Sequence, residues 1–155
     1  MNLYLVQHAE AKQKHEDPER SLSDKGWVDI RRVAAFIAAH SNIKVDNIFH
    51  SGKNRTQQTA QVLAQYLNPA RGVEESEGLQ PLDDPSMWVE RLATKEEDII
   101  LVGHLPHLNK LSAYLICQDP DKKVIVFQEG GIVCLGKDES GTWSIHWMVI
   151  PRLLD

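Results

Sequence analysis

The sequence opens with NLYLVQHA at residues 2–9, an apolar run that leads directly into a histidine. Residues 2–6 predict a short buried strand, because a brief apolar run followed by polar sequence is typical of a strand covered on both faces. Residues 7–20 are polar and predict an irregular loop. Ser23 then stands where a helix N-cap belongs, ahead of apolar residues at helical spacing, namely Val28, Val33, Phe36 and Ile37. The chain therefore begins with a strand, a loop and a helix.

This order of elements is repeated along the chain. Residues 47–50 predict a second strand and residues 55–66 a helix that ends before Asn68-Pro69. Residues 98–102 predict a third strand, and Pro106 suits the first turn of a helix that runs through Leu115. Strands that alternate with helices predict a mainly parallel sheet with helices on both faces.

The C-terminal part has a different pattern. Residues 124–127, 132–135 and 143–149 predict strands joined by glycine-containing turns, so we expect antiparallel strands at the edge of the sheet. The predicted fold is α/β: a three-layer sandwich with a mainly parallel central sheet, helices on both faces and antiparallel C-terminal edge strands.

The composition indicates an ordinary globular protein. Hydrophobic residues make up 42% and charged residues 25% of 155 residues. No repeat, low-complexity tract or linker interrupts the chain, so we expect a single domain over residues 1–155. The net charge of -5, with Lys and Arg scattered, argues against nucleic acid as a partner.

The sequence also predicts where the protein acts. The apolar N-terminus is too short for a signal peptide, and no apolar stretch approaches the roughly 20 residues needed to span a bilayer. Cys117 and Cys134 form no CxxC pair, as expected for reduced thiols. We therefore expect a cytoplasmic protein without a membrane partner.

The ends of the three predicted parallel strands carry the residues of chemical interest. His8 follows the first strand, Ser51 and Arg55 follow the second, and His104 follows the third. Ligands of open parallel sheets bind beyond the carboxyl ends of the strands, so these side chains should meet at one rim. His50 precedes Ser51 and is as compatible with a structural hydrogen bond as with a place in the site.

Two imidazoles and a guanidinium at one rim are suited to phosphoryl transfer through a histidine. One ring nitrogen would act as the nucleophile, and positive donors would surround the phosphoryl oxygens. A guanidinium offers two parallel hydrogen bonds to a phosphate, and Arg55 in the first turn of a helix adds backbone N–H groups and the helix dipole.

Several segments resemble the signatures of the histidine phosphatase (phosphoglycerate mutase-like) superfamily, in particular its SixA-like phosphohistidine phosphatase branch. These segments are LVQHA at 5–9, SGKNRTQQTA at 51–60 and VGHLP at 102–106, supported by RSLSDKG at 20–26, LQPLDD at 79–84 and the closing residues 147–151. Their order, spacing and placement at strand ends agree with one another.

The resemblance implies a role for each site residue. His8 would be the nucleophile that forms a phosphohistidine intermediate, and Arg55 and His104 would bind and polarise the phosphoryl group. Arg20 would reach the phosphoryl group from the first loop. The implied reaction needs neither a metal nor another cofactor, and the implied substrate is phosphohistidine in a signalling protein such as a phosphotransfer domain.

The chain departs from the family pattern at one place. Gln7-His8-Ala9 stands where the family has Arg-His-Gly. Gln7 can still donate hydrogen bonds to a phosphate, but the lost charge is expected to lower binding or turnover by about tenfold or more. Ala9 adds a Cβ where glycine allows close backbone approach, so we expect a differently shaped loop.

Alternatives to the phosphohistidine phosphatase remain open. A small-molecule phosphomonoesterase would need a proton donor for the leaving alkoxide, and Glu77, Asp83 and Asp84 are the candidates. A phosphate-binding or phosphohistidine-binding module would have lost catalysis with the change to Gln7. A zinc site would need more converging ligands than His104 and His107 with one nearby aspartate provide.

Overall fold

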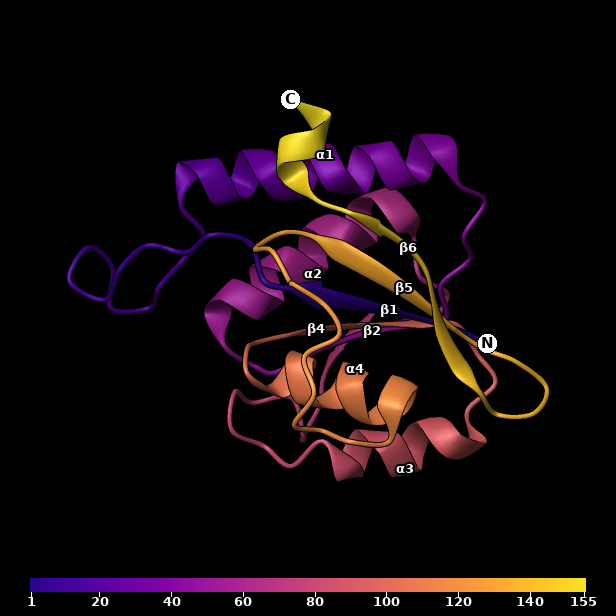
Figure 1. Ribbon diagram of the computed structural model, residues 1–155. Coiled ribbons are helices and arrows are strands. Elements are labelled where there is room, and N and C mark those ends of the chain that lie inside the picture. The colour runs from indigo at the N-terminus through magenta and orange to yellow at the C-terminus, as the bar shows by residue number, and fades with distance from the viewer.

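The computed structural model describes residues 1–155, in which a six-stranded sheet lies between two layers of helices (Figure 1). The strands are β1 (Asn2–Gln7), β2 (Asn47–His50), β3 (Val73–Glu75), β4 (Ile99–Gly103), β5 (Ile132–Lys137) and β6 (Trp143–Val149). The helices are α1 (Asp24–His40), α2 (Asn54–Leu67), α3 (Ser86–Thr94), α4 (His107–Cys117) and a closing 3-10 turn at Pro151–Leu154.

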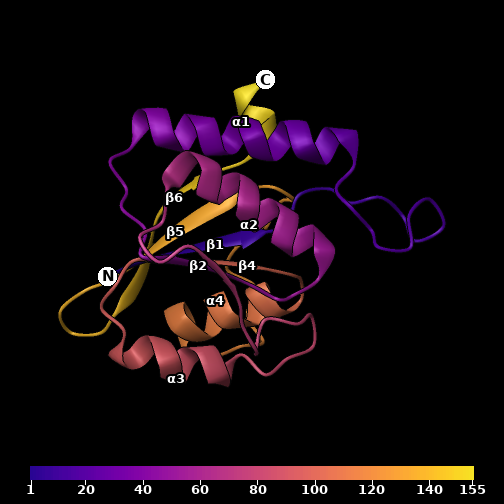
Figure 2. The same ribbon diagram turned by 180° about the vertical axis from the view of Figure 1, so that it is seen from behind.

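The topology confirms the predicted α/β class. The strand order is β3-β2-β4-β1-β5-β6; β1 and β2 both pair in parallel with β4, β3 pairs in parallel with β2, and β5 is antiparallel to β1 and β6. Figures 1 and 2 show α1 and α2 on one face of the sheet and α3 and α4 on the other. None of these helices is both long and apolar enough to cross a membrane.

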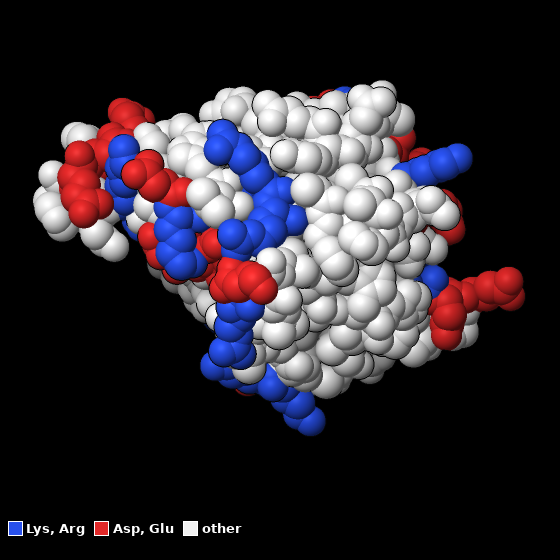
Figure 3. All heavy atoms as spheres, turned by 90° about the horizontal axis from the view of Figure 1, so that it is seen from above, with Lys and Arg blue, Asp and Glu red and all other residues white.

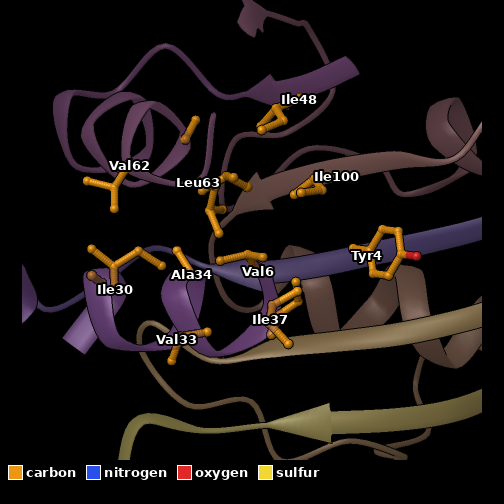
Figure 4. Close-up of a cluster of buried hydrophobic side chains, with 14 of the residues drawn as sticks. Tyr4, Val6, Ile30, Val33, Ala34, Ile37, Ile48, Val62, Leu63 and Ile100 are labelled. Carbon is orange, nitrogen blue, oxygen red and sulfur yellow. The ribbon is translucent and has the colours of Figure 1, made fainter. Parts of the chain in front are cut away.

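Each face of the sheet contributes to its own hydrophobic core. Tyr4 and Val6 of β1 pack under α1 and α2, whereas Leu3 and Leu5 pack toward α3 and α4. Figure 4 shows the first of these cores, with Val6 between the helices and the neighbouring strands. Because side chains alternate along a strand, a strand buried on both faces must be apolar throughout, and this explains the run at the N-terminus.

The helix α1 is fixed to the loop that follows β1. Its N-cap is Ser23, as predicted: the hydroxyl accepts a 3.0 Å hydrogen bond from the Gly26 N–H. The Ser23 N–H donates to the Glu10 carbonyl at 2.9 Å. A Cβ on Gly26 would lie 2.1 Å from that same carbonyl oxygen, so only glycine permits this approach.

The C-terminal segment differs from the prediction in one strand. Residues 124–127 form no strand, although 132–137 and 143–149 do. Both edges of β5 are already occupied by β1 and β6, and Ile125 and Phe127 instead pack as a loop into the core beside α4. The apolar run at 124–127 therefore reflected a loop with two buried side chains rather than a strand. The sequence analysis also named neither β3 nor α3.

Candidate active site

The parallel strands bring the predicted residues to one rim. Gln7 of β1 lies opposite Gly103 of β4, so His8 and His104 are the next residues beyond a paired position. On the other side of β4, His50 lies opposite Val102, which places Ser51 beside His104. The ring centroids of His8 and His104 are 5.2 Å apart.

Hydrogen bonds on several sides hold His8 in place. Its backbone N–H donates to the Gly103 carbonyl at 3.1 Å, and its carbonyl accepts from the Gly130 N–H at 3.2 Å. The next residue, Ala9, is fully buried and donates its N–H to the Thr59 hydroxyl at 3.0 Å. The ring of His8 therefore stands on a rigid strand end rather than on a free loop.

The tautomer of His8 follows from its hydrogen bonds. Nδ1 lies 2.8 Å from the carbonyl oxygen of Ala9. A carbonyl can only accept, so Nδ1 carries the proton and Nε2 carries the lone pair. The Nε–H of Arg55 donates to that Nε2 at 3.3 Å. The nitrogen with the free electron pair is thus the one beside the guanidinium.

A chain of hydroxyl groups orients His104 in the same way. The Thr56 hydroxyl donates to the Lys53 carbonyl at 2.7 Å, so it accepts from the Ser51 hydroxyl at 2.9 Å. The Ser51 oxygen is then left to accept from Nε2–H of His104 at 2.7 Å. Nε2 therefore holds a proton, and Nδ1 is the nitrogen that gains or loses one.

Burial and neighbouring cations keep both imidazoles neutral. Burial, and then the charges of Arg55 and Arg20, lower the pKa of His8 to about 4, although the bond to Ala9 opposes the shift. For His104, burial is again the largest cause and the charges around it add to the effect, so its pKa falls to about 3. At neutral pH Nε2 of His8 is consequently unprotonated and keeps its lone pair.

This geometry agrees with a comparison between the sequence and known protein families. Residues 3–83 match the model of the histidine phosphatase superfamily (branch 1), which is more than half of the chain. The chain belongs to the histidine phosphatase superfamily. The matched region contains His8 and Arg55, while His104 lies beyond it. A comparison with curated proteins finds no match.

The fold is also that of solved histidine phosphatases. The protein histidine phosphatase SixA complexed with tungstate is 22% identical, with a TM-score of 0.85 and full coverage of both chains. A protein named SixA from Agrobacterium tumefaciens is 21% identical (TM-score 0.76, 97% of each chain). A mycobacterial glucosyl-3-phosphoglycerate phosphatase is 15% identical (TM-score 0.71, 94% of this chain and 98% of the other).

Arg20 acts on the site through its charge, whereas the side chain of Gln7 forms no hydrogen bond with the site residues. Arg20 has a left-handed backbone, with φ 48°, and its Nε–H donates to the Lys12 carbonyl at 3.1 Å. Its charge lowers the pKa values of His8 and Arg55, which places it within electrostatic reach of both. No hydrogen bond joins the Gln7 side chain to the other site residues, and its buried Oε1 has no partner.

Ser51 was predicted to lie at the rim, but the positioning of the two imidazoles by Ser51, Thr56 and Thr59 was not predicted. Ser51 and Thr56 orient His104, and Thr59 supports the backbone after His8 while its own hydroxyl donates to the Arg55 carbonyl at 2.8 Å. Gln80 donates to the Ser51 carbonyl at 2.6 Å. The signal was present, since threonines at helical spacing beside Arg55 are polar residues on the buried face of an amphipathic helix.

Several carboxylates line a cleft beside Ser51. Glu77, Asp83 and Asp84, the predicted proton donors, are joined there by Glu75, which the sequence analysis did not name. Hydrogen bonds from Ser86 lower the pKa of Asp84, so this carboxyl is poorly suited to donate a proton. Glu75 lies beside the turn that precedes α2, because a Cβ on Gly52 would meet its carboxylate.

The remaining histidines have other surroundings. His50 Nδ1 accepts from the Gly52 N–H at 3.0 Å, which is the structural role considered above. His107 is fully buried, and neither of its ring nitrogens has a hydrogen-bond partner. The structure contains no group of three or more His, Cys, Asp or Glu side chains placed to share a metal ion.

The Ser51 hydroxyl should be required for full activity. Ser51→Ala removes the acceptor of the His104 Nε2–H, so the ring can turn, and we expect kcat on an aryl phosphate to fall by about tenfold. Ser51→Thr keeps the hydroxyl and should retain most of the activity. Thermal unfolding of both variants checks that the fold is intact. An alanine variant as active as the wild type would refute this role.

The two buried imidazoles should make the fold sensitive to acid. An unfolded histidine has a pKa near 6.5, so the unfolded chain takes up protons at higher pH than folded His8 and His104 do. The stability that the neutral rings provide is complete above about pH 6.5 and is lost as pH falls toward about 4. Between about pH 7 and 4.5, the free energy of unfolding measured in urea should therefore fall less in His104→Asn than in the wild type.

The exposed His15 supplies the matched control for this measurement, because it makes no hydrogen bond through its ring and lies in the outer loop. His15→Asn should follow the wild-type pH dependence. If His104→Asn did so as well, the burial of a neutral imidazole would not contribute to the acid sensitivity.

Proposed function

We propose that this protein is a metal-independent phosphohydrolase that works through a phosphohistidine intermediate on Nε2 of His8. The observation that carries the proposal is the fixed tautomer: the Nδ1–H bond to Ala9 leaves the Nε2 lone pair free, 3.3 Å from Nε of Arg55. Membership of the histidine phosphatase superfamily supports the reaction class. We also propose that residues 1–155 are one catalytic domain that acts in the cytoplasm.

The reaction takes place in two displacements. Arg55 transfers its hydrogen bond from Nε2 to a phosphoryl oxygen and Nε2 attacks phosphorus. The bond from phosphorus to the leaving nitrogen or oxygen breaks, and the leaving group keeps the electron pair and takes up a proton from solvent. Water then attacks the phosphohistidine and gives up a proton to solvent, the bond from phosphorus to Nε2 breaks, inorganic phosphate leaves, and the electron pair returns to Nε2. Arg55, His104 and Arg20 stabilise the charge on the phosphoryl oxygens in both steps.

His104 binds the phosphoryl group best when protonated. Its Nε2–H is engaged by Ser51, so a hydrogen bond to phosphate must come from Nδ1, which gains a proton as the dianion approaches. A negative charge nearby favours the imidazolium and thus offsets the burial that keeps the His104 ring neutral. The ring can therefore serve as a binding group despite its low pKa in the free protein.

Phosphohistidine in a signalling protein, such as a phosphotransfer domain, is the substrate we propose. An imidazole leaves readily once protonated, so this reaction makes a smaller demand on a general acid than hydrolysis of a phosphomonoester does. The similarity in fold to the protein histidine phosphatase SixA supports the choice.

A small-molecule phosphomonoesterase is the second candidate, and one observation favours it. Glu75, Glu77 and Asp83 line the cleft beside Ser51, where a carboxyl group can protonate a leaving alkoxide. The third candidate, a binding module without turnover, is favoured by the loss of the arginine charge at Gln7.

Hydrolysis of a phosphohistidine-bearing phosphotransfer domain and of an aryl phosphate, both with EDTA, distinguishes these functions. We expect the wild type to prefer the phosphohistidine and His8→Asn to lose at least about a thousandfold in kcat. Gln7→Arg should raise kcat/KM by about tenfold through a charge-assisted bond. His15→Asn is the matched control and should be fully active.

Faster turnover of phosphomonoesters than of the phosphoprotein would favour the second candidate. Absence of wild-type turnover on both substrates, with activity appearing in Gln7→Arg, would show that the natural protein is a binding module.

A further inference from the structure

A positively charged cleft lies at the rim and includes Arg55 in its lining. The loop between β1 and α1 and the start of α2 form its two walls, and its lining side chains include Lys14, Arg20, Lys53 and Arg55, with Glu19 as the one carboxylate. The whole protein has a net charge of -5, so this concentration of positive charge is local. The loop protrudes from the body of the molecule beyond the end of the sheet (Figures 1 and 2).

The four basic side chains of this cleft have no acidic partner. No carboxylate oxygen lies within 4.0 Å of their nitrogen atoms, whereas Lys25, Arg32, Arg71 and Lys95 elsewhere in the protein each form an ion pair. Repulsion between the unpaired groups is visible in the pKa of Arg55, which burial and then the charge of Arg20 lower. Such an arrangement is stabilised when an anion binds.

One phosphoryl group does not account for all of this charge. Arg55 and His104 flank His8 directly and are matched to the oxygens of the transferred group. Lys14 is exposed on the outer wall of the cleft, farther along the loop. The opposite side of the rim is lined by Glu75, Glu77, Asp83 and Asp84 and repels anions. A second negative group of the substrate therefore has only the basic side available.

The lining of the cleft also indicates what kind of molecule carries this group. Pro18 is the one apolar side chain that lines it and no aromatic side chain does, so it offers neither an aromatic stacking surface for a base nor an extended apolar wall for a compact ligand. Figure 3 shows side chains of both charge signs gathered on the protruding end, while much of the adjoining face is uncharged. An open charged cleft of this kind is suited to the surface of another protein.

We propose that Lys14 and Lys53, which line the cleft beside Arg20, bind acidic side chains that flank the phosphohistidine of a protein substrate. This inference rests on the proposed function and specifies its substrate: a phosphohistidine with Asp or Glu on the side that faces the loop. The bound carboxylates accelerate association and hold the phosphoryl group toward Nε2 of His8, so the effect belongs to kcat/KM.

Two synthetic phosphohistidine peptides test this inference, one with Asp and Glu flanks and one with Asn and Gln at the same positions. Phosphoimidazole, which has no flank, is the third substrate and reports on the chemistry alone. The wild type should prefer the acidic peptide by about three- to tenfold in kcat/KM, and added salt should reduce the preference. Lys14→Glu should abolish it, and Glu19→Gln should increase it. Phosphoimidazole turnover should stay within about twofold in both variants.

The matched control is Lys122→Glu, the same charge reversal at an exposed lysine in the α4–β5 connection. It should keep the wild-type preference. Equal kcat/KM for the two peptides in the wild type, while phosphoimidazole is hydrolysed, would overturn the inference and leave the proposed function standing. A nucleoside monophosphate hydrolysed faster than the acidic peptide would also overturn it. Failure on every substrate would remove the proposed function itself and the inference with it.

Discussion

Strand β4 lies between β1 and β2, and its backbone hydrogen bonds hold Gln7 opposite Gly103 and His50 opposite Val102. All three strands run in the same direction, so they end together, and the residue after each end emerges at the same rim. His8, Ser51 and His104 meet because of this pairing. The helix α2 starts a few residues after β2 and therefore brings Arg55 to the same place. A parallel sheet thus converts three distant sequence positions into one site.

The site depends as much on acceptors as on charges. The Ala9 carbonyl and the Ser51 hydroxyl each fix one imidazole, and they fix opposite nitrogens: Nδ1 of His8 and Nε2 of His104 carry the protons. One ring therefore presents a lone pair and the other presents the nitrogen that can take up a proton. Burial and the charge of Arg55 lower the pKa of both rings and keep them neutral.

Sequence patterns were sufficient for the sheet class. They also predicted that His8, Arg55 and His104 lie at one rim, because His8 and His104 directly follow apolar strands and Arg55 lies in the first turn of the helix after β2. The hydrogen bonds of Thr59 and Ser51 were not predicted, since helical spacing shows that a hydroxyl is buried but not which distant residue it bonds to. The strand expected at 124–127 was wrong for a related reason: an apolar run indicates that side chains are buried, but not that a strand edge is free to pair with them. The departure at Gln7 was clear from the sequence, but the lack of a hydrogen-bond partner for its buried Oε1 depends on packing that the sequence does not reveal.

The proposed mechanism requires a covalent phosphoryl group on His8, and trapping this group tests it most directly. The wild type would be mixed with excess phosphohistidine substrate, quenched in alkali within the first turnover and digested for mass spectrometry. We expect an acid-labile, alkali-stable phosphoryl group on His8 that is absent from His8→Asn. Turnover without any covalent phosphoryl group, or a phosphoryl group on another residue that persists in His8→Asn, would contradict it.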